Sequence, residues 1–426
     1  MPTARGWTVM VTGFGLWAAG RAFGASPLEQ LGFALVVLVA LAVGVVNLGR
    51  HDLVIARQLR PERAGAGAPV QVSLNFVNRG RGPAPLLLLS DRLPSALAGH
   101  ARFALRGVEP GGQRNAGYVV RAPGRGSYEI GPLEITYVDP FALARVRTLA
   151  AGTNTLLVYP RIDKLTLPRD GGEQRSLATA ALRQPVGLKT EDFYTLREFV
   201  EGDDLRRIHW PATAKRDRPM IRQEETPWHT RATVLLDDRA EAHGGIGELS
   251  GFERAVEAAA SLVDLYHRSG YSWRLGAVHE PGLPPARGAE HRARCLDLLA
   301  AVEARPGDGR ALLTRLAELE RAGQPEGALV LAGGTLELEG AAALSRCRRR
   351  FKTVIALLFP AHRFGLDAPR DRWQGEAQLH DVLALLRRAG VRTLVVGPGE
   401  SLAGAWLALA GGVDGGVRWA LRAGRA

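Results

Sequence analysis

Cysteine is almost absent from this sequence, since only Cys295 and Cys347 occur among its 426 residues. Each lies inside a segment with a helical pattern. Two isolated cysteines provide neither a disulfide framework nor the clustered ligands of a structural zinc site. This composition is consistent with a reducing compartment.

The motifs of several enzyme classes are also missing. The sequence has no H-E-x-x-H, no G-x-S-x-G and no Walker-type G-x-x-x-x-G-K. Gly397-Pro398-Gly399 follows a predicted strand, but it lacks the third glycine and the nearby acidic residue of a dinucleotide-binding fingerprint. We therefore predict no cofactor.

Lysine is rare as well, so the net charge of +12 comes almost entirely from arginine. Nucleic-acid binding requires clustered positive charge together with aromatic side chains that stack on bases. The densest basic run, residues 346–352, contains one aromatic residue, Phe351. Attraction to anionic lipid requires only an excess of positive charge near a membrane segment. We therefore favour lipid over nucleic acid as the anionic partner.

Two apolar runs stand near the start of the chain, at residues 7–24 and 31–48. At about 1.5 Å per helical residue, each is just long enough to cross a hydrocarbon core of about 30 Å. Because only six residues separate them, the two helices must return antiparallel. We predict a transmembrane helical hairpin over residues 1–50. The alternative for the first run is a signal peptide that ends near residue 24.

The charges around the hairpin predict its orientation. Arg5 precedes the first run and four arginines follow the second, whereas Arg21 in the turn region is balanced by Glu29. By the positive-inside rule, both ends of the hairpin should be cytoplasmic. The expected location is the inner (plasma) membrane, with two spans and cytoplasmic soluble domains. The four arginines are Arg50, Arg57, Arg60 and Arg63.

Residues 51–162 show the two-residue alternation of β-strands, most clearly at residues 70–77. Glycine and proline punctuate the gaps, which predicts an antiparallel β-sandwich of about seven strands. Residues 163–190 are polar and lack periodicity, so we interpret them as a linker. The predicted strands are residues 70–77, 86–89, 102–105, 118–121, 128–130, 133–138 and 155–159.

In residues 231–426, strand-like runs alternate with amphipathic helices. This βαβ rhythm predicts an α/β fold with a doubly wound, mostly parallel sheet. The predicted strands are residues 232–236, 273–278, 328–331, 353–358 and 394–396. The predicted helices are residues 252–267, 290–302, 311–321, 341–349 and 377–388.

Polar chemistry is concentrated in residues 193–215, FYTLREFVEGDDLRRIHWPATAK. Their first half alternates like a short strand, and residues 201–204 end that pattern. Asp203 or Asp204 can accept the unpaired N–H groups of a following helical turn. Pro211 fits the first position of a second turn, because proline lacks the N–H that such a position leaves unpaired.

Two accounts of this stretch remain open. In the first it is a capped helix with local ion pairs, anchored by buried Ile208 and Trp210. In the second, Arg206, Arg207 and His209 face a partner or a substrate, and the stretch is a docking or catalytic surface.

The same stretch resembles the signature of the bacterial domain-of-unknown-function family fifty-eight (DUF 58), R-E-Y-x-x-G-D-D-x-R-x-I-x-W-x-x-[ST]-A-[RK]. Phe199 replaces the tyrosine and Pro211 interrupts the helical part. The resemblance implies two membrane helices, an immunoglobulin-like sandwich, a signature segment (residues 191–230) and a von Willebrand factor A-like domain. In the sandwich, Asp139-Pro140-Phe141-Ala142-Leu143 resembles the family's D-P-F-G-L turn, in which we expect Phe141 to pack the corner.

Von Willebrand factor A-like domains can hold a divalent ion at the carboxyl end of the first strand through D-x-S-x-S. The corresponding residues 237–241 read DDRAE, so the hydroxyls are missing and Arg239 adds a cation where a ligand is needed. We predict no metal site here. Asp237 and Asp238 should instead cap the loop or pair with Arg239.

Two functions remain. The resemblance implies a membrane-anchored, non-enzymatic interaction protein that works with a MoxR-type AAA+ ATPase in protein maturation or complex assembly. The alternative is a hydrolase that uses Asp203, Asp204 and His209 as acid, base or metal ligands. Catalysis would require these side chains to converge on an open cleft. The expected partner-binding residues are Gly202, Asp203, Asp204, Arg206, Arg207, His209 and Trp210.

Overall fold

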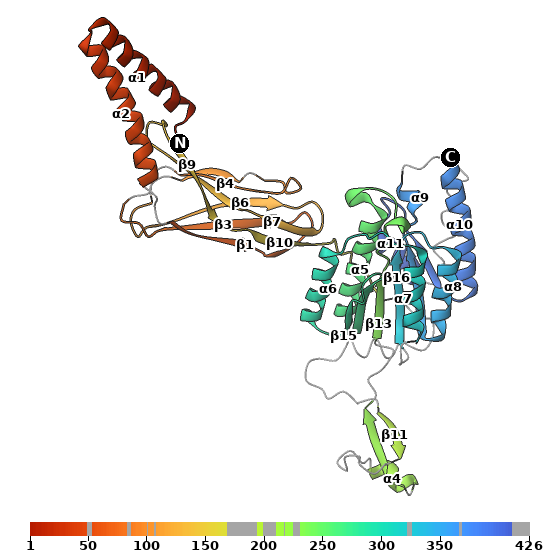
Figure 1. The fold of residues 1–426 in the computed structure, drawn as a ribbon. Coiled ribbons are helices and arrows are strands. Elements are labelled where there is room, and N and C mark those ends of the chain that lie inside the picture. Colours follow the sequence, from red (N-terminus) through yellow and green to blue (C-terminus); the bar gives the residue numbers. More distant parts are fainter. Residues whose placement is uncertain are drawn as a thin grey trace. The chain divides into compact units, whose positions relative to one another are not determined.

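The structure is a computed structural model of the chain (Figure 1). It divides into two compact units, Met1–Tyr159 and Pro160–Ala426. Each unit has its own sheets and its own hydrophobic core. The structure describes residues 1–48, 53–82, 87–99, 101–105, 108–167, 194–198, 210–216, 218–224, 231–321, 326–365 and 369–410.

Two helices open the first unit, α1 (Ala4–Phe23) and α2 (Ser26–Leu48), and Figure 1 shows them side by side. Gly24 takes a φ of 66°, a left-handed conformation that glycine adopts easily, and it ends α1. Gly32 allows close packing, because a Cβ there would collide with the backbone of Trp17. One helix of the described residues is long and apolar enough to cross a membrane, with a mean hydropathy of 2.3 over Ser26–Asn47. The two-span topology stays a prediction.

The helices are joined to the sandwich that follows them. The Thr3 hydroxyl donates to the Ala142 carbonyl at 2.6 Å and accepts the Gly6 N–H at 3.1 Å, so it caps α1 and ties it to a sandwich turn. Val39 of α2 lies in the same buried cluster as Phe76 of the sandwich. The helices and strands of this unit therefore share a core.

The described part of the first unit contains ten strands, more than the pattern predicted. They form sheets in the orders β1-β3-β6, β2-β10-β7 and β5-β4-β8-β9. Leu74 and Phe76 of β3 are buried in one cluster with Leu87 of β4 and Ile135 of β8, which packs the sheets face to face. The strands are β1 (Leu53–Arg60), β2 (Arg63–Gly65), β3 (Pro69–Asn78), β4 (Leu87–Asp91), β5 (Arg102–Leu105), β6 (Gln113–Arg121), β7 (Gly126–Ile130), β8 (Leu133–Val138), β9 (Arg145–Ala151) and β10 (Asn154–Tyr159).

A charged pair lies inside the sandwich. Arg57 donates from Nε and Nη2 to the two carboxylate oxygens of Asp91 at 3.0 and 2.6 Å, and both side chains are at most 1% exposed. Arg57 Nη1 also donates to the carbonyls of Ile130 and Gly152, at 3.1 and 2.5 Å. Burial raises the pKa of Tyr118, and its hydroxyl donates to Asp91 at 2.6 Å. Fixed partners therefore surround both charges.

The turn after β8 differs from the prediction in one respect. Asp139 accepts the N–H groups of Phe141 at 2.9 Å and of Ala144 at 2.5 Å. Ala142 takes a φ of 57°, which explains why the similar turn has glycine at this position. Phe141 was expected to pack the corner, but it is 67% exposed, because the carboxylate of Asp139 and not an apolar contact holds the turn.

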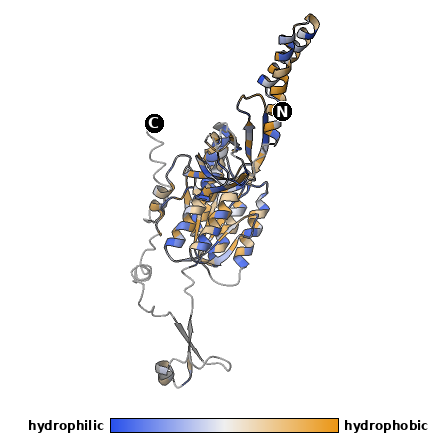
Figure 2. Cartoon of the chain, turned by 90° about the vertical axis from the view of Figure 1, so that its left-hand side faces the viewer, coloured by the Kyte–Doolittle hydropathy of each residue, from blue (hydrophilic) through white to orange (hydrophobic). Residues whose placement is uncertain are grey.

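The second unit contains a six-stranded sheet in the order β15-β14-β13-β16-β17-β18. Neighbouring strands are parallel except β14 and the edge strand β15, which confirms the predicted mostly parallel, doubly wound sheet. Figure 2 shows these strands as predominantly hydrophobic. The strands are β13 (Arg231–Leu236), β14 (Ser272–Ala277), β15 (Leu283–Ala286), β16 (Glu326–Gly333), β17 (Phe351–Leu358) and β18 (Arg392–Val395).

Helices pack against this sheet through leucine-rich faces. Leu316 of α7, Leu344 of α8 and Leu386 of α10 lie in one buried cluster with residues of β16 and β17. The exposed residues of α7 are polar, namely Arg310, Thr314, Glu318 and Arg321. The helices are α5 (Gly251–Arg268), α6 (Ala289–Ala301), α7 (Gly309–Arg321), α8 (Leu338–Arg346), α9 (Ala361–Phe364), α10 (Pro369–Arg388) and α11 (Leu402–Ala410), with short 3₁₀ turns η3 (Ala240–Ala242), η4 (Gly247–Leu249) and η5 (Cys347–Arg349).

The first residues of the predicted linker pack on the α/β unit. The Asp163 N–H donates to the Ser261 hydroxyl at 2.9 Å, and Trp406 Nε1 donates to the Thr166 carbonyl at 2.6 Å. Leu165 between them is 1% exposed. Residues 163–167 therefore belong to the second unit, and residues 168–190 lie outside the described part of the chain.

Candidate functional site

The described part of the signature segment is a two-stranded hairpin with a short helix in its connection. Strand β11 (Tyr194–Glu198) pairs antiparallel with β12 (Met220–Glu224), and α4 (Trp210–Arg216) precedes β12. The predicted short strand is therefore present, and Pro211 lies in the first turn of α4 as expected. The Met220 N–H donates to the Thr213 hydroxyl at 3.0 Å, so α4 is tied to the start of β12.

Six of the predicted site residues lie outside the described part of the chain, namely Gly202, Asp203, Asp204, Arg206, Arg207 and His209. Trp210 is described, and it is 68% exposed. The prediction that Trp210 is a buried anchor is therefore wrong. The apolar residue buried where α4 meets β12 is Met220, which is 2% exposed.

Trp210 borders a hollow of about 350 Å³. An aromatic side chain, a hydroxyl and a guanidinium thus lie together on a surface that is open to solvent. This arrangement suits binding of another protein's side chain, because aromatic residues and arginine dominate interface energies. The lining residues are Trp210, Thr213, Ala214, Arg218 and Pro219.

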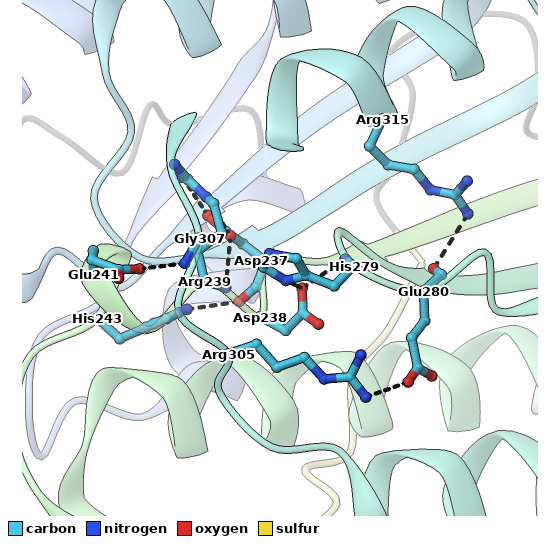
Figure 3. Close-up of polar contacts among 10 residues, drawn as sticks. All are labelled: Asp237, Asp238, Arg239, Glu241, His243, His279, Glu280, Arg305, Gly307 and Arg315. Carbon is cyan, nitrogen blue, oxygen red and sulfur yellow. Dashed lines mark hydrogen bonds and ion pairs between the residues drawn. The ribbon is translucent and has the colours of Figure 1, made fainter. Parts of the chain in front are cut away.

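A second candidate site lies at the carboxyl ends of β13 and β16. The strand order reverses between these two strands, and ligands of doubly wound sheets bind at that point. The residues that follow β13 are Asp237, Asp238 and Arg239, and those that follow β16 are Gly334 and Thr335. Figure 3 shows the polar side chains gathered there.

The Asp237 carboxylate forms an ion pair with Arg239, two residues along the chain. Arg239 donates from Nε and Nη2 to the two oxygens of Asp237, both at 2.8 Å, and the two side chains are 5% and 2% exposed. Burial opposes the charge of Arg239, but hydrogen bonds and charge from Asp237 outweigh it and raise the pKa of the guanidinium. This confirms the predicted pairing of Asp237 with Arg239. Both carboxylate oxygens of Asp237 are thus engaged by a guanidinium.

The hydroxyl of Thr335, which follows β16, also has a hydrogen-bond partner. Thr335 Oγ1 accepts the N–H of Ala361 at 2.9 Å, and the Thr335 N–H donates to the Ala242 carbonyl at 2.6 Å. Among the described residues, no three His, Cys, Asp or Glu side chains are grouped closely enough to hold a metal ion.

Asp238 is held by the neighbouring strand. Its Oδ1 accepts the backbone N–H of His279 at 3.1 Å and lies 3.0 Å from His279 Nδ1 (Figure 3). Its Oδ2 is buried and has no hydrogen-bond partner in the described part of the chain. Asp238 therefore links the loops after β13 and β14.

A partly buried histidine, His243, lies at the centre of this cluster. His243 Nε2 lies 2.7 Å from the Asp237 carbonyl, and its ring packs edge-on against Phe252. Burial lowers the pKa of His243, and the nearby Asp237 carboxylate only partly offsets this effect. The neutral ring, donating from Nε2 to the carbonyl, is therefore the stable form at neutral pH.

An exposed ion pair and a backbone hydrogen bond tie the surrounding loops together. Arg305 Nη2 lies 2.6 Å from Glu280, and the Gly307 N–H donates to Glu241 at 3.0 Å. Backbone N–H groups of Glu241 itself and of Gly307 lower the pKa of the Glu241 carboxyl. Asp237, Asp238, Glu241 and Glu280 thus each have a cation or N–H partner. The arrangement supports a rigid polar surface.

Sequence reasoning missed the histidines of this cluster, because each stands alone in the sequence. His279 comes two residues after the end of β14, and Asp238 comes two residues after the end of β13. The carboxyl ends of parallel strands meet at one edge of a sheet. The equal distance of Asp238 and His279 from their strand ends could therefore have predicted that the two side chains lie close together.

A family model described as "Protein of unknown function DUF58" matches residues 195–363. The signature hairpin and the centre of the α/β sheet thus match DUF58. The match begins within β11 and ends within α9, so it includes both candidate sites.

The chain is also similar to uncharacterized proteins of Mycobacterium tuberculosis and Mycobacterium bovis. It is 29% identical to each over 119 residues, which cover 27% of this chain and 37% of the relative. The chain thus spans about a third of the length of these curated relatives.

Solved structures similar to this chain include a CARDB domain from Pyrococcus furiosus. It is 13% identical and covers 25% of this chain and 93% of that domain, with a TM-score of 0.20. The GAE domain of GGA2p from Saccharomyces cerevisiae is 14% identical and covers 24% and 88%, with a TM-score of 0.17.

Proposed function

We propose that this chain is a membrane-anchored, non-enzymatic interaction protein that docks a protein partner through its DUF58 hairpin. The exposure of Trp210 carries the proposal. This side chain is 68% exposed at the start of a helix that Thr213 ties to β12. A large aromatic residue held in water on an ordered element is the usual anchor of a protein interface.

The partner implied by the resemblance is a MoxR-type AAA+ ATPase, acting in protein maturation or complex assembly. The surface around Trp210 supports a partner that offers an apolar side chain beside negative charge. The hollow accepts the side chain, and Arg218 on its wall attracts the charge. Arg206 and Arg207 of the same segment, which lie outside the described residues, stay expected partner-binding residues.

The second candidate site supports a non-enzymatic role. Its two buried carboxylates are engaged, Asp237 by Arg239 and Asp238 by His279. A catalytic carboxylate needs access to substrate, and these two face the protein. The doubly wound strand order and the aspartates after the first strand also support a von Willebrand factor A-like unit. The hydrolase alternative rests on residues outside the described part of the chain.

The membrane anchor is the helical hairpin α1 and α2. Besides the apolar helix α2, both helices expose large apolar side chains, such as Phe14 at 62% and Phe33 at 63%. This surface is costly in water and matches the hydrocarbon core of a bilayer. Two spans in the inner membrane, with both ends cytoplasmic, follow from the arginine excess. Protease added to intact spheroplasts should then leave the C-terminal units whole.

The docking proposal is tested by co-purification of the full chain with the MoxR-type ATPase of its own organism. We expect Trp210→Ala to weaken association by about 30-fold or more, as the loss of an interface anchor does. Its stability should change by less than about 0.5 kcal/mol, because the side chain is exposed. The matched control is Trp373→Ala, since Trp373 is 79% exposed on α10. Normal binding by folded Trp210→Ala protein would overturn the proposal.

A further inference from the structure

Basic side chains gather at the amino end of β17 and β18, the edge of the sheet opposite Asp237. Five of the seven residues from 346 to 352 are basic and none is acidic. Arg348, Arg349 and Lys352 are exposed, as are Arg387 and Arg388 at the end of α10. We call this group the basic edge. Its members are Arg346, Arg348, Arg349, Arg350, Lys352, Arg387, Arg388 and Arg392.

The fold brings these two sequence segments together. Strands β17 and β18 are parallel neighbours, with Ile355 opposite Arg392. The Arg348 side chain reaches the turn after α10, since a Cβ at Gly390 would lie 3.7 Å from Arg348 Nε. Arg348 Nη1 also donates to the Lys352 carbonyl. Residues about 40 positions apart in the sequence thus form one surface.

Helix ends explain only part of this charge. Cations stabilise the carboxyl ends of helices, and Arg346, Arg387 and Arg388 are placed for that role in the last turns of α8 and α10. In the described residues, Glu320 forms an ion pair with Arg346 at 3.5 Å, whereas Arg350 Nε and Nη2 are buried without a hydrogen-bond partner. Like charges gathered on one surface repel one another, so an anionic surface placed against them would be attracted.

The available chemistry favours lipid headgroups over nucleic acid. Phe351 is the one aromatic residue of the run, and at 1% exposure it packs in the core and is not available to stack on a base. Binding to anionic headgroups requires only positive charge spread over a surface. The membrane anchor proposed above also tethers the α/β unit to a bilayer through the chain, and tethering raises the effective lipid concentration.

We propose that the basic edge binds the anionic phospholipid headgroups of the membrane surface. This inference rests on the membrane anchorage of the proposed function. Because each basic residue near an anionic surface strengthens binding about fivefold, removing three should weaken it on the order of a hundredfold.

The test uses the full chain inserted in phosphatidylcholine nanodiscs and mixed with sucrose-loaded vesicles that are then sedimented. The nanodiscs should sediment with vesicles that contain phosphatidylglycerol and not with vesicles of phosphatidylcholine alone. Added salt should reverse this binding. The triple variant Arg348→Glu, Arg349→Glu and Lys352→Glu should lose it by on the order of a hundredfold.

A variant with the same charge change elsewhere is the control. Arg294→Glu, Arg310→Glu and Arg370→Glu reverse three exposed arginines of the same unit outside the basic edge, and this protein should bind as the wild type does. Equal loss in both variants would show a net-charge effect and overturn the proposal. Tighter binding to single-stranded RNA than to phosphatidylglycerol vesicles would also overturn it, in favour of a nucleic-acid surface.

The two proposals fail in different ways. If the full chain does not insert into nanodiscs, the membrane anchorage is wrong. If it inserts and does not bind phosphatidylglycerol vesicles, the anchorage stands and the lipid-binding role of the basic edge is wrong.

Discussion

Both units bury an arginine–aspartate pair, but the two pairs have different structural roles. Arg57 and Asp91 are 34 residues apart, and Arg57 also holds the carbonyls of Ile130 and Gly152. Arg239 and Asp237 are two residues apart in one loop. The first pair joins strands that meet only in the folded state, whereas the second shapes a loop at the edge of a sheet.

The surroundings of the two pairs also differ, since one pair lies inside a core and the other lies in a loop at the end of a sheet. Asp91 accepts hydrogen bonds from Arg57 and Tyr118 inside the sandwich core. The loop of Asp237 lies where doubly wound sheets bind ligands, and the neighbouring Asp238 Oδ2 has no hydrogen-bond partner in the described residues. A buried arginine–aspartate pair thus joins strands in one unit and shapes a loop in the other.

The largest expected effect comes from breaking the sandwich pair. Arg57→Met leaves the Asp91 carboxylate buried without its counter-charge, so we expect the sandwich to lose about 3–5 kcal/mol of stability. Hydrogen–deuterium exchange of peptides from residues 53–159 in the full chain measures this loss separately from the α/β unit.

Two variants control for the loss of the side chain itself. Arg57→Met combined with Asp91→Leu removes both charges and should recover much of the stability. Arg92→Met breaks an exposed pair with Glu134 and should cost less than about 1 kcal/mol. A single variant as stable as the wild type would mean that the pair is not structural.

Breaking the loop pair should cost less. Arg239→Ser leaves Asp237 near the edge of the sheet, where water can reach a rearranged loop, so we expect a loss of about 1–3 kcal/mol. Fluorescence of Trp273 and Trp406, both at most 1% exposed, reports unfolding of this unit.

The same substitution tests the ligand position. It removes the internal cation and adds a hydroxyl, so millimolar Mg²⁺ should raise the melting temperature of Arg239→Ser protein and leave the wild type unchanged. Arg239→Met, which adds no oxygen ligand, should gain less. A shift of several degrees in the wild type would contradict the view that Arg239 occupies the cation position.

A smaller effect, the pH dependence of stability, should also distinguish the α/β unit from the sandwich. The folded pKa of His243 lies below the ordinary value of about 6.5, so between these values the unfolded chain binds more protons. The stability of the α/β unit should therefore fall as the pH falls below about 6.5. Burial lowers the pKa of His291 as well, which adds to the effect.

Hydrogen–deuterium exchange as a function of pH checks this sign. His243→Gln should flatten the dependence in peptides of the α/β unit. Residues 53–159 contain a single histidine, His100, so the sandwich should change less than the α/β unit over the same range. A parallel loss in both units would point to a cause other than the buried histidines.

Much of the fold follows from sequence periodicity, and the exceptions have physical reasons. The run that became β13 was predicted because a strand buried on both faces is continuously apolar. Strand β1 was missed because the buried Arg57 interrupts its apolar alternation. Strand β9 was missed because most of its side chains are exposed, so no alternation marks it.

The candidate sites were less predictable. The pairing of Asp237 with Arg239 is local in sequence and was predicted, whereas the contact of Asp238 with His279 depends on which strands are neighbours. Trp210 was assigned to the core because tryptophan is usually buried. A short helix has too few positions for a periodic pattern to show which side faces solvent.

The smallest expected effect concerns the two loops in which an aspartate accepts backbone N–H groups. Asp139 accepts two backbone N–H groups in its turn, and Asp237 accepts the Arg239 N–H in its own. Only the first of these loops contains a left-handed non-glycine residue, Ala142 with a φ of 57°. Its Cβ crowds the backbone, so Ala142→Gly should stabilise the sandwich by about 1 kcal/mol, despite the greater freedom of glycine in the unfolded chain.

The same substitution in the other loop should have the opposite sign. Ala240 begins the 3₁₀ turn η3 with ordinary backbone angles, so Ala240→Gly relieves no strain and should destabilise the α/β unit by about 0.5–1 kcal/mol through unfolded-state entropy alone. Denaturant unfolding measures the change in the free energy of unfolding of each variant relative to the wild type. If Ala142→Gly also destabilises, the hydrogen bonds of Asp139 hold the turn without strain, and the two aspartate loops are alike in their backbone energetics.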